Sequence, residues 1–219
     1  MLTFQRDHSL DGSDTPFGIV EVMYPEPEHW GADAFYALVD ERLTRLKAAA
    51  PDYDRKAVFG ENPYCRFFKK FKKTYPVLLQ YESVLLKDRP FPRENPITGV
   101  PFLTELETHV LTGTHDAEQV RGTVTLYTAD AKVPFLGLRG DEVHTYPHDF
   151  CARDDEGIIF SMIAGADLRT CARESSRHVF YPVFGVPGQA AEELMAVQEL
   201  LGRYASVLAP EAEIRTALL

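Results

Sequence analysis

Apolar and polar residues follow a helical period in the first half of the chain. Between Ala32 and Ala49, apolar side chains recur every three or four positions and charged side chains fill the opposite face, which predicts an amphipathic helix. Prolines stand where the next helices would begin, because proline is well tolerated in a first turn. Further helices are predicted at residues 63–73, at residues 76–87 and from Pro96 onward.

The second half of the chain is typical of a β-sheet. From about Arg121, the segments GTVTLYTA, KVPFLGL, GIIFSMI and HVFYPVFG follow one another, separated by Gly, Asp and Pro turns. An earlier strand is predicted at residues 16–24, and residues 188–208 again show a helical apolar face. The chain is therefore predicted to be α+β, with a helical first half, an antiparallel or mixed β-sheet second half, and a C-terminal helix packed on the sheet.

Length and composition predict a single domain over residues 1–219. Of the 219 residues, 45% are hydrophobic, which is enough for one substantial core. No apolar stretch reaches the roughly 20 residues of a membrane span, and no apolar segment of the secretory type follows the N-terminus. We therefore expect a cytoplasmic protein. Three widely spaced cysteines, Cys65, Cys151 and Cys171, suit neither a disulfide framework nor a zinc site.

Charge is unevenly distributed along the sequence. The formal net charge is −10, which is unusual for a protein that handles nucleic acid. Residues 66–93 nevertheless carry eight basic and two acidic side chains. The alternatives are a phosphate-binding face and an ordinary helix surface, in which phenylalanines pack inward and lysines are solvated. The candidate nucleic-acid-binding residues are Lys69, Lys70, Lys72 and Lys73.

The sequence lacks the motifs of the common cofactor and metal enzymes. It contains no GxGxxG, GxxxxGK[ST], GxSxG or HExxH pattern. Glu105 and His109 are four residues apart, and we expect them to form a surface pair on a helix. His144 and His148 have the same spacing, but Pro147 prevents a regular helix there. We expect no metal and no cofactor.

The order of the motifs resembles a known family. The stretch FFKKFKKTYPVLLQYESVLLKDRPFPRENPITGVPFL contains a Tyr-Pro-led helix, a proline loop and an Asn-Pro that starts a second helix. It is followed by THDAEQVRGTVTLYTA, by GDEVHTYPHDFCARDDEGII and by GADLRTCARESSRHVFYPVFG. Over residues 63–187 this ordered set resembles the B3/B4 domain of the phenylalanyl-tRNA synthetase β subunit. A strand and helix at 15–50 and the helix at 188–208 flank this core.

The resemblance implies an editing pocket for aromatic amino acids. The B3/B4 domain of the synthetase tests the para position of an aromatic side chain and hydrolyses tyrosine wrongly esterified to tRNA-Phe. Asn95 lies near an asparagine of the motif and is a candidate substrate-binding residue. Arg169 and Thr170 fall where a turn of the family approaches the pocket, so Arg169 could hold a carboxylate or a phosphate. The alternative for Arg169 is a solvated arginine on a hairpin turn.

The candidate catalytic residues are Glu82, His115 and Asp167, of which Asp167 is implied by the resemblance alone. Apolar neighbours surround Glu82, so burial would raise its pKa and suit it to acid–base chemistry. His115 titrates near neutral pH, and Asp116 beside it could fix the imidazole tautomer or bind substrate. The family's histidine aligns two residues earlier, near Gly113. The alternatives are an exposed, ion-paired Glu82, and a surface loop in which Asp116 caps a short helix.

Two enzymatic functions and one binding function are compatible with these patterns. The first is trans-editing, in which the chain binds a mischarged aromatic aminoacyl-tRNA and hydrolyses the ester. The second is a biosynthetic enzyme that uses the same pocket for a free aromatic amino acid, for example in a Pictet–Spengler-type cyclisation with a buried glutamate as acid and base. The third is a non-catalytic module that binds RNA or protein. The expected partners are an aromatic amino acid or an aromatic aminoacyl-tRNA, with no DNA and no membrane.

Overall fold

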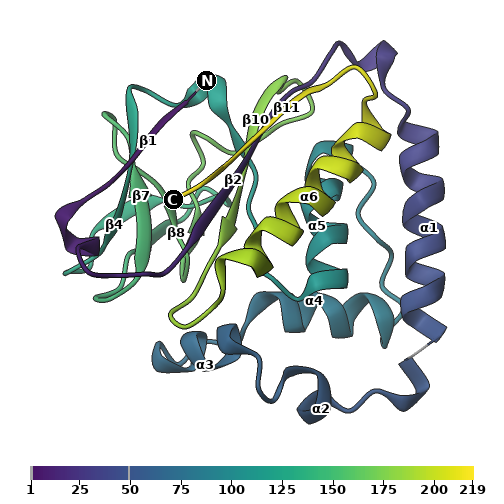
Figure 1. Ribbon diagram of the computed structural model, residues 1–219, viewed down its shortest axis with the longest axis horizontal. Coiled ribbons are helices and arrows are strands. Elements are labelled where there is room, and N and C mark those ends of the chain that lie inside the picture. The colour runs from purple at the N-terminus through teal and green to yellow at the C-terminus, as the bar shows by residue number, and fades with distance from the viewer. Residues whose placement is uncertain (1, 49) are drawn as a thin grey trace.

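Helices and sheets occupy opposite sides of the molecule. The computed structural model describes residues 2–48 and 50–219. In Figure 1 the sheets lie at the left and most helices at the right, with α6 running between the sheets and α1. The helices are α1 (Ala32–Ala48), α2 (Arg55–Phe59), α3 (Pro63–Lys70), α4 (Pro76–Leu85), α5 (Pro96–Thr108) and α6 (Ala191–Leu208).

The predicted helices are confirmed, and their starts have local causes. Proline occupies the first turn of α3, α4 and α5. The side chains of Asn62 and Asn95 accept backbone N–H groups at the starts of α3 and α5. Ala49, predicted to end the first helix, lies outside the described residues. No helix among the described residues is both long and apolar enough to cross a bilayer.

The strands form two larger sheets and a separate hairpin. One sheet has the order β1-β4-β7-β8-β9 and the other β11-β2-β10-β3, while β5 pairs with β6. The β1–β4 pair is parallel and the other pairs are antiparallel, so the sheet structure is mixed, as predicted. The strands are β1 (Thr3–Arg6), β2 (Phe17–Met23), β3 (His115–Asp116), β4 (Thr123–Thr128), β5 (Pro134–Leu136), β6 (Glu142–His144), β7 (Phe150–Arg153), β8 (Ile158–Ser161), β9 (Gly165–Ala166), β10 (His178–Phe184) and β11 (Glu213–Leu218).

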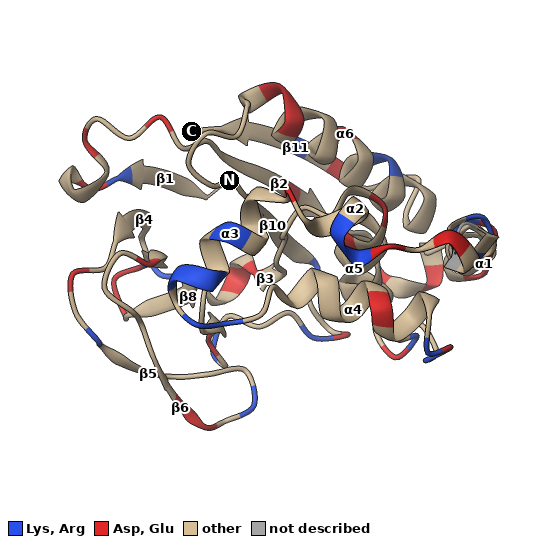
Figure 2. Ribbon diagram, turned by 90° about the horizontal axis from the view of Figure 1, so that it is seen from below, with Lys and Arg blue, Asp and Glu red and all other residues tan. Residues whose placement is uncertain are grey.

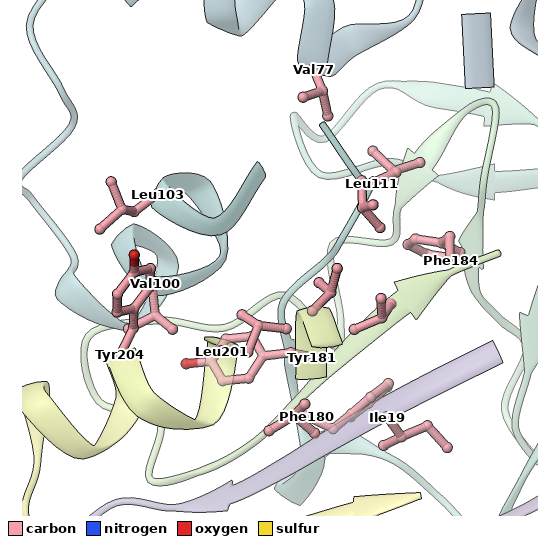
Figure 3. Close-up of a cluster of buried hydrophobic side chains, with 14 of the residues drawn as sticks. Ile19, Val77, Val100, Leu103, Leu111, Phe180, Tyr181, Phe184, Leu201 and Tyr204 are labelled. Carbon is pink, nitrogen blue, oxygen red and sulfur yellow. The ribbon is translucent and has the colours of Figure 1, made fainter. Parts of the chain in front are cut away.

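The core joins the two sheets and attaches the helices to them. Phe17 on β2 is fully buried and packs against Phe150 and Phe160 of one sheet and Phe184 of its own sheet. The C-terminal helix α6 covers β2 and β10, as predicted. Figure 3 shows Leu201 of this helix among the buried side chains of α5 and β10. The sheets and α6 thus share one continuous apolar layer.

Candidate functional site

A cavity of about 280 Å³ opens beside the turn between α3 and α4. Its walls come from β8, from the turn that follows β8, from β10 and from the segment that leads into β3. The lining is mostly apolar and contains a few polar side chains, which is the usual composition of a small-molecule site. The lining residues that carry the argument below are Lys73, Thr112, His115, Phe160, Ser161 and Phe184.

His115 is held in the cavity wall by stacking and by a hydrogen-bond relay. Its imidazole stacks on Phe180, with ring centroids 4.9 Å apart. Nδ1 lies 2.9 Å from the Thr170 hydroxyl, which donates its proton to Asp167. The Thr170 oxygen therefore accepts a hydrogen bond from Nδ1–H, and this fixes the tautomer in which Nε2 carries a free lone pair. The relay joins His115, Thr170 and Asp167, all three of which are candidate site residues from the sequence.

Burial keeps the His115 imidazole neutral. Desolvation lowers the pKa of His115 to about 3. Burial also raises the pKa of Asp167, against the opposing effect of the Thr170 hydrogen bonds and of Arg169. At neutral pH the imidazole is therefore a hydrogen-bond acceptor that can orient a water molecule or a substrate N–H or O–H group.

Thr112 links the cavity to a buried glutamate that the sequence placed on the surface. The Glu105 Oε1 atom accepts from the Thr112 backbone N at 2.8 Å and from its hydroxyl at 2.9 Å. Glu105 is only 5% exposed, so the predicted surface pair with His109 is wrong. His109 instead ends α5 in a left-handed conformation with φ 57°. Burial raises the pKa of Glu105 to about 7.

Ser161 links the cavity to a second buried carboxyl group. Its hydroxyl donates to Asp149 and accepts from the Ala164 backbone N at 2.8 Å. The Asp149 side chain also accepts from the Ile163 backbone N at 3.3 Å. Burial raises the pKa of Asp149 to about 6. The sequence did not single out any of these residues, because an aspartate at the start of a short strand gives no signal of burial.

Glu82 lies outside the cavity lining and is fully engaged in an ion pair. Arg55 donates to its two oxygens at 2.6 and 2.5 Å, and the Tyr53 hydroxyl donates at 2.8 Å. These contacts, with Arg55 first, lower the pKa of Glu82 despite burial. The expected upward shift is therefore wrong, because the guanidinium outweighs desolvation.

The candidate substrate-binding residues are mostly bonded within the protein. Asn95 caps α5, and the Asp116 side chain accepts from the Glu118 backbone N and the Ser176 hydroxyl. Arg169 donates to the Gln119 carbonyl at 2.6 Å and to Asp154 at 2.8 Å. With Asp167, Arg169 borders a separate surface hollow of about 510 Å³, whose lining includes neither Asn95 nor Asp116.

The basic turn after α3 lies at the cavity. Figure 2 shows basic residues on α3 and on the loop that follows it. Lys73 lines the cavity, and its Nζ lies 5.7 Å from the centre of the Tyr146 ring, with Lys132 Nζ at 5.9 Å from the same ring. Phe68 packs inward while the lysines are exposed. Among the described residues, no carboxylate lies within 4.0 Å of the four lysines Lys69, Lys70, Lys72 and Lys73.

Comparisons with known proteins find similarity to solved structures but not to a family model or a curated sequence. No protein-family model matches the sequence, and no curated protein matches it. An N-terminal fragment of the phenylalanyl-tRNA synthetase β subunit from Pyrococcus horikoshii aligns with 98% of this chain and 50% of its own length, with a TM-score of 0.49 and 12% identity. The chain thus spans about half of that fragment. Within residues 2–48 and 50–219, no three His, Cys, Asp or Glu side chains converge as a metal ion would require.

Replacing Glu105 with glutamine is expected to stabilise the protein at high pH. A carboxyl whose pKa is 4.5 when unfolded and about 7 when folded favours folding at low pH, and this contribution is lost as pH rises through about 7. Glutamine keeps the acceptor for Thr112 and carries no charge at any pH, so it has no ionised form to desolvate.

The difference in unfolding free energy between Glu105→Gln and wild type should grow by about 2 kcal/mol from pH 5 to pH 8. Urea titrations at the two pH values measure it. The exposed Glu174→Gln serves as the matched control, because no basic nitrogen of the described residues lies within 4.0 Å of its carboxylate. An equal difference at both pH values would show that Glu105 is not a desolvated acid.

Proposed function

We propose that this chain binds an aromatic aminoacyl group in the His115 cavity and hydrolyses the ester of a mischarged aminoacyl-tRNA. The observation that carries the proposal is the cavity itself, in which apolar walls surround a neutral imidazole of fixed tautomer. Phe160 and Phe184 offer faces and edges for an aromatic ring. The ordered sequence motifs that resemble the B3/B4 domain support the same proposal, which implies a cytoplasmic protein.

His115 acts in this proposal by orienting the attacking water. The water adds to the ester carbonyl carbon, the bond from that carbon to the ribose oxygen breaks, and the amino acid and a free ribose hydroxyl are released. Nε2 accepts one hydrogen bond from the water and holds it against the carbonyl. Because the pKa of His115 is about 3, the imidazole is too weak a base to keep the proton of the attacking water. The proton therefore passes to the leaving ribose oxygen.

The lysines at the cavity mouth provide the contact with tRNA. The side chains of Lys69, Lys70, Lys72 and Lys73 are exposed, and Lys73 belongs to the cavity lining itself. Phosphate contacts of this kind supply affinity that falls with salt, because counterions are released on binding.

Deacylation of tyrosyl-tRNA-Phe tests the proposal. Release of tyrosine above a no-protein control is the expected result, and a correctly charged phenylalanyl-tRNA-Phe provides the comparison. Absence of release at protein concentrations that saturate tRNA binding would contradict the hydrolytic function.

Changing Lys69, Lys70, Lys72 and Lys73 together to glutamine should weaken tRNA binding and flatten its salt dependence. Each lost phosphate contact lowers the slope of log affinity against log salt by about 1. Filter binding at several salt concentrations measures the slope. Changing Lys47, Lys56, Lys87 and Arg203 together to glutamine is a charge-matched control, because none of them lies at the cavity. An identical loss of slope there would argue against a specific face.

A biosynthetic enzyme acting on a free aromatic amino acid is the second candidate. Glu105 favours it, because a carboxyl with a pKa of about 7 behind the cavity is suited to proton transfer near neutral pH. The acidic net charge of −10 also fits a small-molecule substrate better than tRNA. Ligand binding without any retention of tRNA would support this second function.

A further inference from the structure

Three polar side chains of the cavity lining, Thr112, His115 and Ser161, are each linked to a buried carboxyl group, and we call these three the inner wall. The other polar side chains of the lining, Lys73 and Thr74, are exposed. Two of the inner-wall groups are hydroxyls bonded directly to the carboxyl, and the third is the imidazole bonded through Thr170. The carboxyl groups come from α5, from the turn before β7 and from the segment after β9, which are far apart in the sequence. The three connections are Thr112 to Glu105, Ser161 to Asp149, and His115 through Thr170 to Asp167.

The direction of these hydrogen bonds makes the inner wall a set of acceptors. A hydroxyl has one proton, and Thr112 and Ser161 each direct it to a carboxyl group. The remaining lone pairs of these oxygens, and Nε2 of His115, are left for a ligand. The Ser161 oxygen uses one lone pair for the Ala164 backbone N–H, so one is free. A ligand that contacts the inner wall must therefore supply N–H or O–H donors.

The charged groups around the cavity also favour a ligand that donates hydrogen bonds. Among the described residues, no Lys, Arg or His nitrogen lies within 4.0 Å of the Glu105 or Asp149 carboxyl oxygens. Asp167 differs in having a basic neighbour, Arg169, whose Nε lies 3.8 Å from its Oδ2 atom. Lys73, the basic side chain of the lining, is exposed at the mouth. Glu105 and Asp149 therefore lie behind the inner wall without a basic partner among the described residues, while the positive charge of Lys73 lies at the mouth.

We propose that this cavity selects an aromatic amine whose ammonium group has no free carboxylate beside it. Such an ammonium supplies three N–H donors to the acceptor wall and compensates its buried acidic groups. A carboxylate on the ligand, next to the ammonium, would face only hydrogen-bond acceptors and acidic groups. With no donor to hydrogen-bond it, its burial there is unfavourable. The proposal rests on the proposed function only for the choice of the cavity as the ligand site.

This preference explains how substrate and product would differ in affinity. In an aminoacyl ester the carboxyl group is esterified and carries no charge, so the ammonium is the only charge near the ring. Hydrolysis creates a carboxylate beside that ammonium, and the product loses affinity for the same wall. The acidic groups behind the cavity thus favour entry of the ester and release of the free amino acid.

Four small probes with one aromatic body test the proposal by calorimetric titration at pH 8. They are 2-phenylethylamine, its neutral isostere 2-phenylethanol, phenylalanine and 3-phenylpropionate. At this pH the amine is protonated and most of the carboxyl groups of the wall are ionised. The amine should bind about tenfold more tightly than the alcohol and than phenylalanine, because charge-assisted hydrogen bonds are stronger than neutral ones. The carboxylate probe should bind least.

The variants Asp149→Asn and Glu105→Gln should each reduce the ratio of amine affinity to alcohol affinity from about tenfold to about threefold or less. The exposed Glu211→Gln should keep the wild-type preference. Equal binding of amine and alcohol, binding of phenylalanine as tight as the amine, or no binding of any probe would overturn the proposal. An intact amine preference together with absent tRNA deacylation would instead reject only the proposed hydrolysis.

Discussion

Replacing His115 with alanine is expected to lower the rate of tyrosyl-tRNA-Phe deacylation by about 100-fold. The imidazole is the polar ring in the cavity wall, and its Nε2 lone pair is left free by the relay through Thr170. A group that positions the reacting water typically contributes a factor of about 10² or more. Single-turnover release of labelled tyrosine at saturating protein gives the rate without a contribution from product release.

The relay provides a second variant that separates positioning from folding. Thr170→Val removes the acceptor of Nδ1–H but preserves the shape of the side chain, so the imidazole loses its fixed tautomer. We expect a loss of about tenfold in rate, with tRNA affinity unchanged, since the change lies away from the lysines. If Thr170→Val and His115→Ala both leave the rate within a factor of two of wild type, His115 does not orient the water.

Replacing Phe17 with alanine is expected to lower the free energy of unfolding by about 3–5 kcal/mol. Phe17 is completely buried, and its ring contacts Phe150, Phe160 and Phe184 at centroid distances of 5.5, 6.0 and 5.8 Å. Because these rings belong to both sheets, the cavity left by alanine cannot close without moving one sheet.

Urea unfolding monitored by circular dichroism measures this loss. Met195→Ala on α6 is the matched control, because the methionine is 49% exposed and its removal should change stability by less than about 0.5 kcal/mol. Since Phe160 also lines the cavity, Phe17→Ala should weaken ligand binding as well. A loss of stability below about 1 kcal/mol would mean that the sheets are not joined through Phe17.

The longer helices were predictable because their signals are local, whereas the short helix α2 (Arg55–Phe59) was not predicted. Proline at the first turn and a capping asparagine act on neighbouring residues, so the starts at Pro63 and Pro96 follow from the sequence. The strand at Thr3–Arg6 was missed because it is short, and its parallel partner β4 lies more than a hundred residues away. Glu213–Leu218 was missed because a mostly exposed edge strand carries no alternating apolar pattern.

The candidate site was predictable only in part, because buried polar partners come from distant segments. His115 was singled out and does line the cavity, and Thr170 and Asp167 join it through hydrogen bonds. The direction of the Glu82 pKa shift was wrong because Arg55, 27 residues earlier, forms the decisive contact. The four-residue spacing of Glu105 and His109 is typical of a pair on a helix surface. Glu105 is buried only because other elements pack around α5, which the spacing does not reveal.

The most direct test of the central claim is to locate an aromatic aminoacyl group on the protein. The probe is tyrosine joined to the 3′ position of adenosine through an amide, which this reaction hydrolyses slowly, observed by NMR of the labelled protein. The account predicts shift changes at His115, Ser161 and Thr112 and in the Lys73 turn, with little change around Arg55 and Glu82. Changes confined to the hollow beside Arg169 and Arg173, with none at His115, would contradict it.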